Sequence, residues 1–274
     1  MTASIVAAVF DTFPSSQFLK LATSMVEKCS FVEEIFIFGT EPISNHSFIR
    51  IERIKNIQDY NYQVLVNLHK HIPDKHVLIY QWDGFPLNPD VWSDEFLNFD
   101  YLGAPHKSDK YHCEFFNGGF SLRSPQLNKK VHDLILQYPE LINHPEDAII
   151  CHLLREKLEF SNCNFPNTAI ASRFAFEHEQ MLNTFGFHGV FNLPSLINEE
   201  ILIQCIPELI EKVSNTDILS YFLFHGYSLN QELLLRNCVS RAHEWGAMNA
   251  ILERIRKNTP NSDFSKMLLS MDPY

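Results

Sequence analysis

His76-Val77-Leu78-Ile79-Tyr80-Gln81-Trp82-Asp83-Gly84 is a stretch in which an apolar run leads directly into a carboxylate and a glycine. Short apolar runs bounded by polar residues are typical of buried strands in a parallel sheet. Asp83 then stands at the carboxyl end of the strand, and open α/β sheets bind their ligands outside these ends. The stretch therefore predicts an α/β fold with a ligand site around residues 81–84.

The sequence before this stretch has the pattern of a βαβ unit. Apolar runs at Ser4–Phe10 and Glu34–Phe38 predict buried strands, and Ser15–Cys29 between them has apolar residues at helical spacing. A short strand is expected at Ile49–Ile54 and a helix at Tyr60–His71. These elements favour a sheet whose first strands are parallel.

The sequence after Gly84 predicts fewer strands and more helix. It is rich in loop residues up to about residue 116, and Asn117-Gly118-Gly119 has the composition of a turn before a short strand, Phe120–Arg123. A helix is expected over about 124–138, and a second one opens at Asn143–Asp147 and runs to about Lys157, while residues 160–194 are expected to be mostly irregular. Further helices are expected at 197–213, 216–225, 229–240 and 242–257. This change from mixed strands, loops and helices to helices alone predicts two parts, an α/β domain at 1–194 and a helical subdomain at 195–274.

Composition excludes some classes of function. The 274 residues carry 33 Asp and Glu against 22 Lys and Arg, a net charge of -11, and such acidity disfavours nucleic-acid binding. The six cysteines are scattered, which favours free thiols in a reducing compartment over disulfides or a zinc site. We see no targeting or membrane-spanning segment and expect a cytoplasmic protein, with peripheral contact at the inner membrane face left open.

Five short motifs in order resemble the bacterial DUF5672 family over roughly residues 4 to 194. They are Val77–Pro89, Asp100–Pro105, Asn117–Ser124, Glu146-Asp147 and Gly186–His188. Members of this family are usually regarded as similar to glycosyltransferases of the GT-A fold. The resemblance implies a mixed, mostly parallel sheet flanked by helices, with the helical subdomain outside it. Two positions differ from the family pattern: His106 stands where Trp is common, and Phe115-Phe116 where Val-Gly is common.

The resemblance implies a metal site at the carboxyl end of the strand expected at His76–Gln81. GT-A enzymes bind the donor diphosphate through a cation held by an Asp-x-Asp motif, and Gln81-Trp82-Asp83 stands at that place. Asp83 and His188 are the candidate ligands of Mn²⁺ or Mg²⁺. Gln81 is a weaker ligand, or a hydrogen-bonding partner of the donor sugar or ribose. Asp83 as a turn carboxylate and His188 as a loop histidine remain the alternatives, as does direct contact of His188 with phosphate.

An acidic pair supplies the candidate catalytic groups. By analogy with inverting GT-A enzymes, Asp147 is the candidate base for the acceptor hydroxyl, and Glu146 orients the acceptor. The alternative is structural, because acids in a first helical turn after a proline stabilise the helix dipole. An active-site helix start satisfies both interpretations.

The remaining candidates concern the donor. Asp11 and Thr12 follow the first strand, where GT-A folds hold the nucleotide. Trp82 is an aromatic candidate for stacking, and Asn117, Gly118 and Gly119 resemble a loop that lets the backbone approach the donor sugar. Arg123 is expected to pair with phosphate or, alternatively, to form a structural ion pair.

Together these features predict a glycosyltransferase that moves a sugar from a nucleotide diphosphate to a glycan, lipid-linked or protein acceptor. A second hypothesis is a catalytically decayed transferase domain that acts as a binding protein through its helical tail, because the first acid of the metal motif is Gln81. A metal-dependent phosphohydrolase is a weaker third, because it needs more clustered carboxylates. The tail is expected to pack as core, with self-association through it left open.

Overall fold

The computed structural model describes residues 4–108, 113–178, 181, 183–214, 216–258 and 262–271. The chain divides into two compact units. The first comprises residues 1–15 and 19–188, and the second comprises residues 16–18 and 189–274. The division after His188 lies close to the boundary predicted after residue 194.

The first unit is built on a six-stranded sheet with the order β3-β2-β1-β4-β6-β5. The pairs β1–β2, β1–β4 and β2–β3 are parallel, whereas β6 is antiparallel to both β4 and β5. The strands are β1 (Ile5–Asp11), β2 (Val32–Gly39), β3 (Ser47–Arg50), β4 (Val77–Ile79), β5 (Tyr101–Ser108) and β6 (Cys113–Arg123). The prediction of a mixed, mostly parallel sheet flanked by helices is confirmed.

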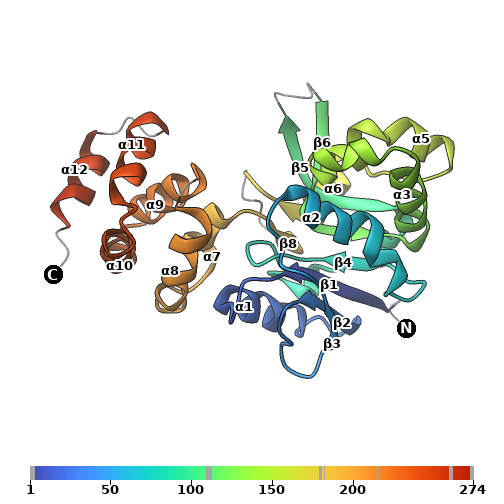
Figure 1. The fold of residues 1–274 in the computed structure, drawn as a ribbon, viewed down its shortest axis with the longest axis horizontal. Helices are drawn as coiled ribbons and strands as arrows, with labels where there is room; N and C mark the ends of the chain where they lie inside the picture. The colour runs from blue at the N-terminus through green and yellow to red at the C-terminus, as the bar shows by residue number, and fades with distance from the viewer. Residues whose placement is uncertain are drawn as a thin grey trace. The chain divides into compact units, whose positions relative to one another are not determined.

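Helices cover both faces of the sheet because its central strands are apolar on both sides (Figure 1). One face packs on α1 (Gln17–Val26), where Thr23 and Tyr80 share a side-chain hydrogen bond of 3.0 Å. The other face, with Val6, Ala8 and Ile79, forms one core with the helical segments after β3 and with α3 (Pro125–Gln137). Strand alternation explains this division.

Two helical segments of this unit change type along their length. The first runs through α2 (Ile57–Asn61), η1 (Tyr62–Asn67) and η2 (Leu68–Lys70), and the second through α4 (Glu146–Ala148), η6 (Ile149–Leu153) and α5 (Arg155–Phe160). Both η1 and η6 are π-helical, a form that often marks functional sites. The predicted helices near 60–71 and 146–157 are present.

The region between Gly84 and Arg123 differs most from expectation. It was predicted as loop up to about residue 116, but β5 and β6 pair antiparallel. Asn117-Gly118-Gly119 was predicted as a turn and is instead part of β6. The register shifts between Gly103 and Pro105, so residues 117–120 bulge opposite Ala104. The glycines and prolines of this hairpin occur at a bulge and at close backbone contacts. In a single sequence the same residues are read as signals of a turn.

Shorter elements complete the first unit. Residues 160–194 were predicted as mostly irregular, yet α6 (Thr168–Phe174) packs against β5, and β7 (Ala175–Phe176) pairs in parallel with β8 (Gly186–Phe187). Besides η2, which is also a 3-10 helix, this unit has short 3-10 turns at η3 (Pro89–Val91), η4 (Asp94–Asn98) and η5 (Pro139–Asn143).

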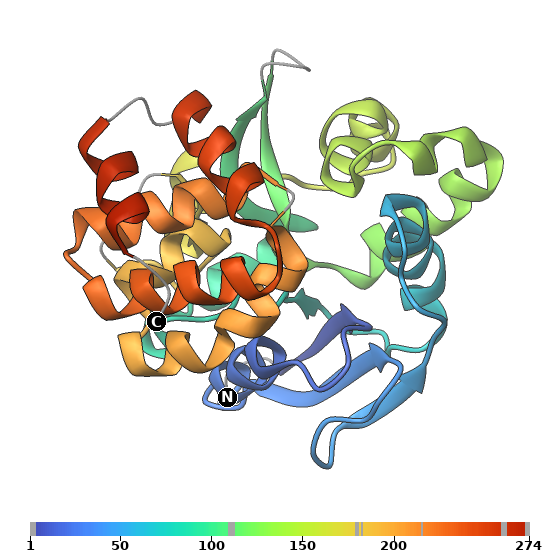
Figure 2. The same ribbon diagram turned by 60° about the vertical axis from the view of Figure 1, so that its left-hand side comes forward.

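The second unit is helical, as predicted. After η7 (Val190–Asn192) and α7 (Leu193–Leu196), five longer helices pack on one another (Figure 2). They are α8 (Glu199–Val213), α9 (Ile218–Ser228), α10 (Glu232–Glu244), α11 (Met248–Asn258) and α12 (Ser262–Ser270). Within the described part of the chain, none of the helices has the length and apolar character that crossing a membrane requires.

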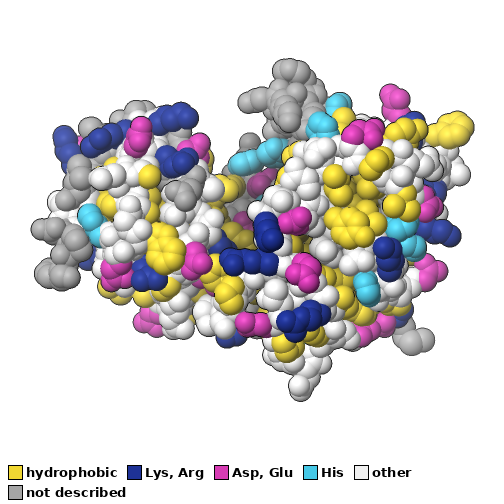
Figure 3. Space-filling view, viewed as in Figure 1, with side chains coloured by type: hydrophobic (Ala, Val, Ile, Leu, Met, Phe, Trp, Pro, Cys, Tyr) yellow, Lys and Arg dark blue, Asp and Glu magenta, His cyan; other side chains and the backbone are white. Residues whose placement is uncertain are grey.

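The charged surface and the cysteines can be compared with the expectations from composition. On the face drawn in Figure 3, basic side chains are interspersed with acidic ones. Cys29, Cys151, Cys163, Cys205 and Cys238 are free and buried. Burial raises the pKa of the Cys29 thiol to about 12, so this thiol stays protonated and unreactive at neutral pH.

Candidate functional site

The strand order creates a switch point between β1 and β4. From β1 the chain continues to β2 and β3 on one side, and it then returns to β4 on the other side. Because β1 and β4 are parallel, Asp11 and the residues after Ile79 lie at the same edge of the sheet. Open α/β sheets bind ligands at such a point, which makes this edge the candidate site.

A tight turn follows β4 and presents Asp83. Gln81 N–H donates to Gly84 O at 2.8 Å, and Gly84 N–H donates back to Gln81 O at 3.2 Å. Trp82 and Asp83 therefore form the tip of the turn. A Cβ at Gly84 would lie 2.8 Å from Cδ2 of His188, so the glycine allows the histidine to approach the turn.

His188 reaches Asp83 because the segment that carries it runs beside the chain after the turn. Leu87 N–H donates to Phe185 O at 2.8 Å, and Gly186 forms a bridge with Pro86. His188 N–H donates to Phe176 O at 2.9 Å. These backbone contacts bring together two predicted metal ligands that are far apart in sequence.

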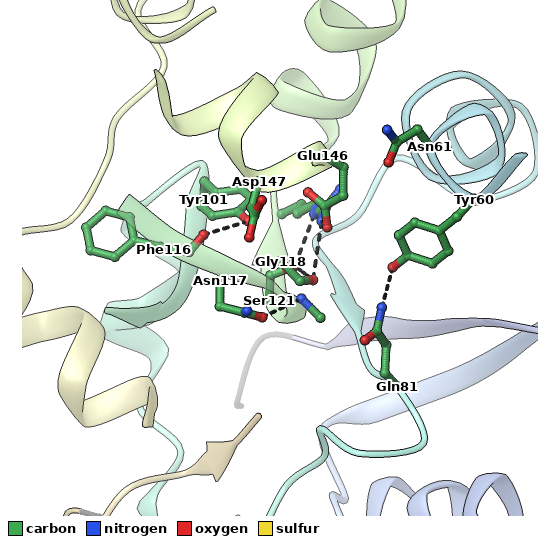
Figure 4. A network of polar contacts seen from close by, with 12 residues as sticks. Tyr60, Asn61, Gln81, Tyr101, Phe116, Asn117, Gly118, Ser121, Glu146 and Asp147 are labelled. Atoms are coloured by element: carbon green, nitrogen blue, oxygen red, sulfur yellow. Dashed lines mark hydrogen bonds and ion pairs between the residues drawn. The ribbon is translucent and has the colours of Figure 1, made fainter. Parts of the chain in front are cut away.

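Three ligand-type atoms face one another at this point. Nε2 of His188 lies 3.2 Å from Oε1 of Gln81 and 3.8 Å from Oδ1 of Asp83. The amide of Gln81 is oriented from its other side, because its Nε2 donates to the Tyr60 hydroxyl at 2.7 Å (Figure 4). This bond directs the oxygen of Gln81 toward His188.

Glu177 holds the other nitrogen of the His188 ring. Its Oε1 lies 3.0 Å from Nδ1 of His188 and also accepts a 3.2 Å hydrogen bond from Nδ2 of Asn117. Burial alone lowers the pKa of His188, but the Asp83 carboxylate and the hydrogen bond to Glu177 outweigh it and raise this pKa to about 9. Without a cation, His188 is therefore an imidazolium at neutral pH and can donate toward Gln81 and Asp83.

The arrangement fits a divalent cation. Ligands of an octahedral ion with bonds of about 2.0–2.2 Å lie roughly 3 Å apart when adjacent and 4 Å apart when opposite, and the two distances from His188 Nε2 fall in this span. A carboxylate on the remote nitrogen of a ligating histidine is also the usual partner in metal sites. Asp83, His188 and Gln81 can therefore hold one metal ion.

Arg123 and Glu146 form a buried ion pair. Nη2 of Arg123 lies 2.8 Å from Oε1 of Glu146, and Nε donates to the Ser121 hydroxyl at 3.1 Å. The side chain of Arg123 is only 1% exposed. Of the two alternatives for Arg123, the structural ion pair is the one observed. A guanidinium with so little exposed surface is not presented to a phosphate. Glu146 is likewise turned into the protein.

Asp147 has a different environment from its neighbour. It is half-buried, and its Oδ1 accepts a 2.7 Å hydrogen bond from the N–H of Ala148. Burial, with a smaller contribution from the charge of Glu146, raises the pKa of Asp147 to about 7. A carboxyl group with this pKa can exchange protons near neutral pH, as a general base requires. The Asp147 charge also contributes to the raised pKa of His188, so the two groups interact.

The glycines of β6 make room for side chains of the site. A Cβ at Gly118 would lie 1.9 Å from Oε1 of Glu146, and one at Gly119 would lie 2.3 Å from Nε2 of His188. Asn117 caps the same bulge, since its Oδ1 accepts a 2.7 Å bond from Gly119 N–H. Close approach of a donor sugar to these glycines stays a prediction.

The nucleotide candidates lie at the same sheet edge. Oδ1 of Asp11 accepts a 2.7 Å bond from the N–H of Phe13, and Oγ1 of Thr12 accepts a 3.0 Å bond from the N–H of Ile54. Trp82 is half-buried at the tip of the turn. Contact of these three residues with a nucleotide remains a prediction.

Sequence reasoning missed four residues of the site. Tyr60 orients Gln81, and Glu177 orients His188, while His106 and His178 surround the second oxygen of Glu177. His106 was visible only as a difference from the family pattern. Glu177 and His178 fall in a segment predicted as irregular, and no local signal in the sequence separates them from ordinary loop residues.

The chain matches one family model, and the matched residues lie within the first compact unit. The family model described as a protein of unknown function, DUF5672, matches residues 44–188, which is more than half of the chain. The chain belongs to the DUF5672 family. The DUF5672 match ends at His188, where the first compact unit also ends, and it includes every site residue except Asp11 and Thr12. No curated protein matches the chain.

Proposed function

We propose that this DUF5672 protein is a glycosyltransferase of the GT-A type. It transfers a sugar from a nucleotide diphosphate to a hydroxyl of a glycan, lipid-linked or protein acceptor. Mn²⁺ or Mg²⁺ bound by Asp83 and His188, with Gln81 as a weaker ligand, assists the reaction. Asp147 is the base, and the reaction inverts the configuration at the anomeric carbon.

The observation that carries this proposal is the convergence of Asp83 and His188 at the β1–β4 switch point, together with the electrostatic interaction of His188 with Asp147, a carboxyl group with a pKa near 7. Hard oxygen ligands with one imidazole are suited to Mn²⁺, and a bound cation would neutralise the negative charge that develops on the leaving diphosphate. The acidic chain otherwise repels such a ligand.

The chemistry assigned to the chain's own residues is proton transfer and positioning. The acceptor oxygen attacks the anomeric carbon, and the bond from that carbon to the phosphate oxygen breaks. The hydroxyl proton passes to Asp147, and the nucleoside diphosphate leaves with the bonding electrons. Attack from the face opposite the leaving group gives inversion. Asp147 contributes roughly 10²- to 10⁴-fold to the rate, the usual range for a positioned base.

The compartment and partners follow from the same proposal. Free, buried cysteines fit a reducing compartment, so we propose that the protein acts in the cytoplasm, with its acceptor in solution or at the inner membrane face. Bacterial surface glycans are the proposed acceptor class. Nucleic acid is not a proposed partner, because the net charge is -11.

The test is a panel of nucleotide sugars, assayed for binding, hydrolysis and transfer with and without Mn²⁺. We expect one donor to bind more tightly with Mn²⁺ and to be turned over. Asp83→Asn should remove the metal dependence, while Asp133→Asn, an exposed aspartate on α3, is the matched control that should behave like wild type. If no nucleotide sugar binds under either condition, the proposal fails.

The hypothesis of a decayed transferase has one observation in its favour. Gln81 replaces an acid, and its amide is engaged by Tyr60. If the protein acts only by binding, Asp83→Ala and Asp147→Asn should leave its biological role intact. Loss of the role in both variants would instead support catalysis.

A further inference from the structure

The second oxygen of Glu177 lies between two histidines. Its Oε2 is 3.3 Å from Nδ1 of His106 and 4.0 Å from Nε2 of His178. The three residues each offer one ligand atom, and these atoms all lie within 4.8 Å of one another. The imidazole rings of the two histidines are also neighbours, with centroids 5.4 Å apart.

We propose that His106, Glu177 and His178 form a second metal site that binds Zn²⁺, separate from the site at Asp83. Two imidazoles and one carboxylate are a ligand set that Zn²⁺ uses with a fourth position open to water. Tetrahedral bonds of about 2.0–2.1 Å place neighbouring ligands roughly 3.3 Å apart. The separation between His106 and Glu177 is already 3.3 Å.

The differing exposure of the three residues is consistent with ion entry from solvent. The side chain of Glu177 is 9% exposed and that of His106 28%, whereas His178 is 59% exposed. The protein fixes the innermost ligand, because the other oxygen of Glu177 is bound by Asn117 and His188. Zinc binding would shorten the 4.0 Å separation between Nε2 of the exposed His178 ring and Oε2 of Glu177.

Glu177 is shared between the two sites, but its oxygens are divided. Oε1 serves His188, and Oε2 faces His106 and His178. A zinc ion on Oε2 therefore leaves the hydrogen bond to His188 in place. The inference does not depend on glycosyl transfer, since it rests on the ligand set alone.

The first experiment measures Zn²⁺ affinity of the full, tag-free chain after metal removal, by competition with a chromophoric chelator. We expect one tight equivalent per chain. His106→Ala and His178→Ala should each weaken binding by more than about tenfold, the lower limit for loss of even an outer partner of a metal ligand. His243→Ala, at an exposed histidine of α10, should bind as wild type. Unchanged affinity in His178→Ala would overturn the proposal.

A second experiment separates this site from the one at Asp83. Asp83→Asn should keep the tight Zn²⁺ equivalent, and loss of zinc in Asp83→Asn but not in His178→Ala would place the ion elsewhere and overturn the inference. Co²⁺ substituted for Zn²⁺ should show the intense visible absorption of a tetrahedral ion. Because His178 is exposed, metal-free His178→Ala should unfold at the same temperature as the metal-free wild type, which shows that any loss of zinc comes from loss of the ligand.

Discussion

Glu177 contacts Nδ1 of His188 at 3.0 Å, and this contact fixes the direction in which the opposite ring nitrogen points. Nε2 faces Asp83 and Gln81 as a result. In metal proteins, a carboxylate in this position sets the ring orientation and raises the basicity of the ligand. Glu177 is therefore a positioning residue for the proposed metal site, although it does not touch the ion there.

Glu177→Gln tests this relationship. The amide loses the negative charge, so we expect Mn²⁺ affinity to fall roughly 10- to 100-fold, the usual cost of losing an outer partner. Mn²⁺ titration followed by electron paramagnetic resonance measures it. Glu140→Gln, at an exposed glutamate of η5, is the matched control. Equal Mn²⁺ affinity in Glu177→Gln and wild type would contradict the assigned role.

Asp147 predicts a pH dependence of transfer. Its pKa is about 7 because of burial and the neighbouring Glu146, and a base must be ionised to accept a proton. The rate should rise as the pH increases through about 7 and then level off. Asp147→Asn should lose this rise and about 10²- to 10⁴-fold of kcat. A variant that keeps the same pH profile would assign the rise to another group.

The same pKa also predicts an effect on stability. The folded chain holds the Asp147 proton more tightly than the unfolded chain, so this group favours folding below the unfolded pKa of about 4. That contribution is lost as the pH rises through about 7. Asp147→Asn should therefore gain stability relative to wild type between pH 5 and pH 8. Urea unfolding of the variant and wild type at pH 5 and pH 8 measures this relative gain in unfolding free energy. Asp133→Asn should show no such gain.

The buried pair of Arg123 and Glu146 should be sensitive to loss of one partner. Arg123→Met leaves a buried, uncompensated carboxylate and should cost about 3–5 kcal/mol of unfolding free energy. The double variant Arg123→Met/Glu146→Leu should recover part of that loss, because neither charge remains. Arg236→Met removes an exposed pair with Glu232 and should cost less than about 1 kcal/mol. Denaturant titration of the four proteins tests this, and a larger loss in the double variant would refute it.

Gly119 should tolerate no side chain. A Cβ there would lie 2.3 Å from Nε2 of His188 and 2.6 Å from Oε1 of Gln81, so Gly119→Ala should displace both and weaken Mn²⁺ binding. Gly226→Ala is the matched control, because Gly226 lies within helix α9 and a Cβ there would approach the side chain of Leu235 no closer than 3.5 Å. Alanine there should be neutral or stabilise by up to about 1 kcal/mol. Normal Mn²⁺ affinity in Gly119→Ala would show that the site adapts.

Local patterns predicted the elements whose structure depends on near neighbours. The run from Ser4 to Phe10 formed β1, and the helical spacing at 15–29 and 197–213 formed α1 and α8. The hairpin of β5 and β6 was missed, because its pairing joins residues such as Leu102 and Leu122 that are distant in sequence. Glycines at its bulge looked like a turn, since the bulge and a turn favour the same residue.

The sequence by itself determined that an apolar strand leads to Asp83 and Gly84, and that an acidic pair begins a helix at residue 146. Only the tertiary structure decided which acid faces inward: Glu146 is bound by Arg123, and Asp147 keeps a half-buried position with a raised pKa. It also brought Glu177 and His106 to the site. The physical reason is that side-chain orientation and pKa depend on partners brought near by chain packing, and these partners are not neighbours in sequence.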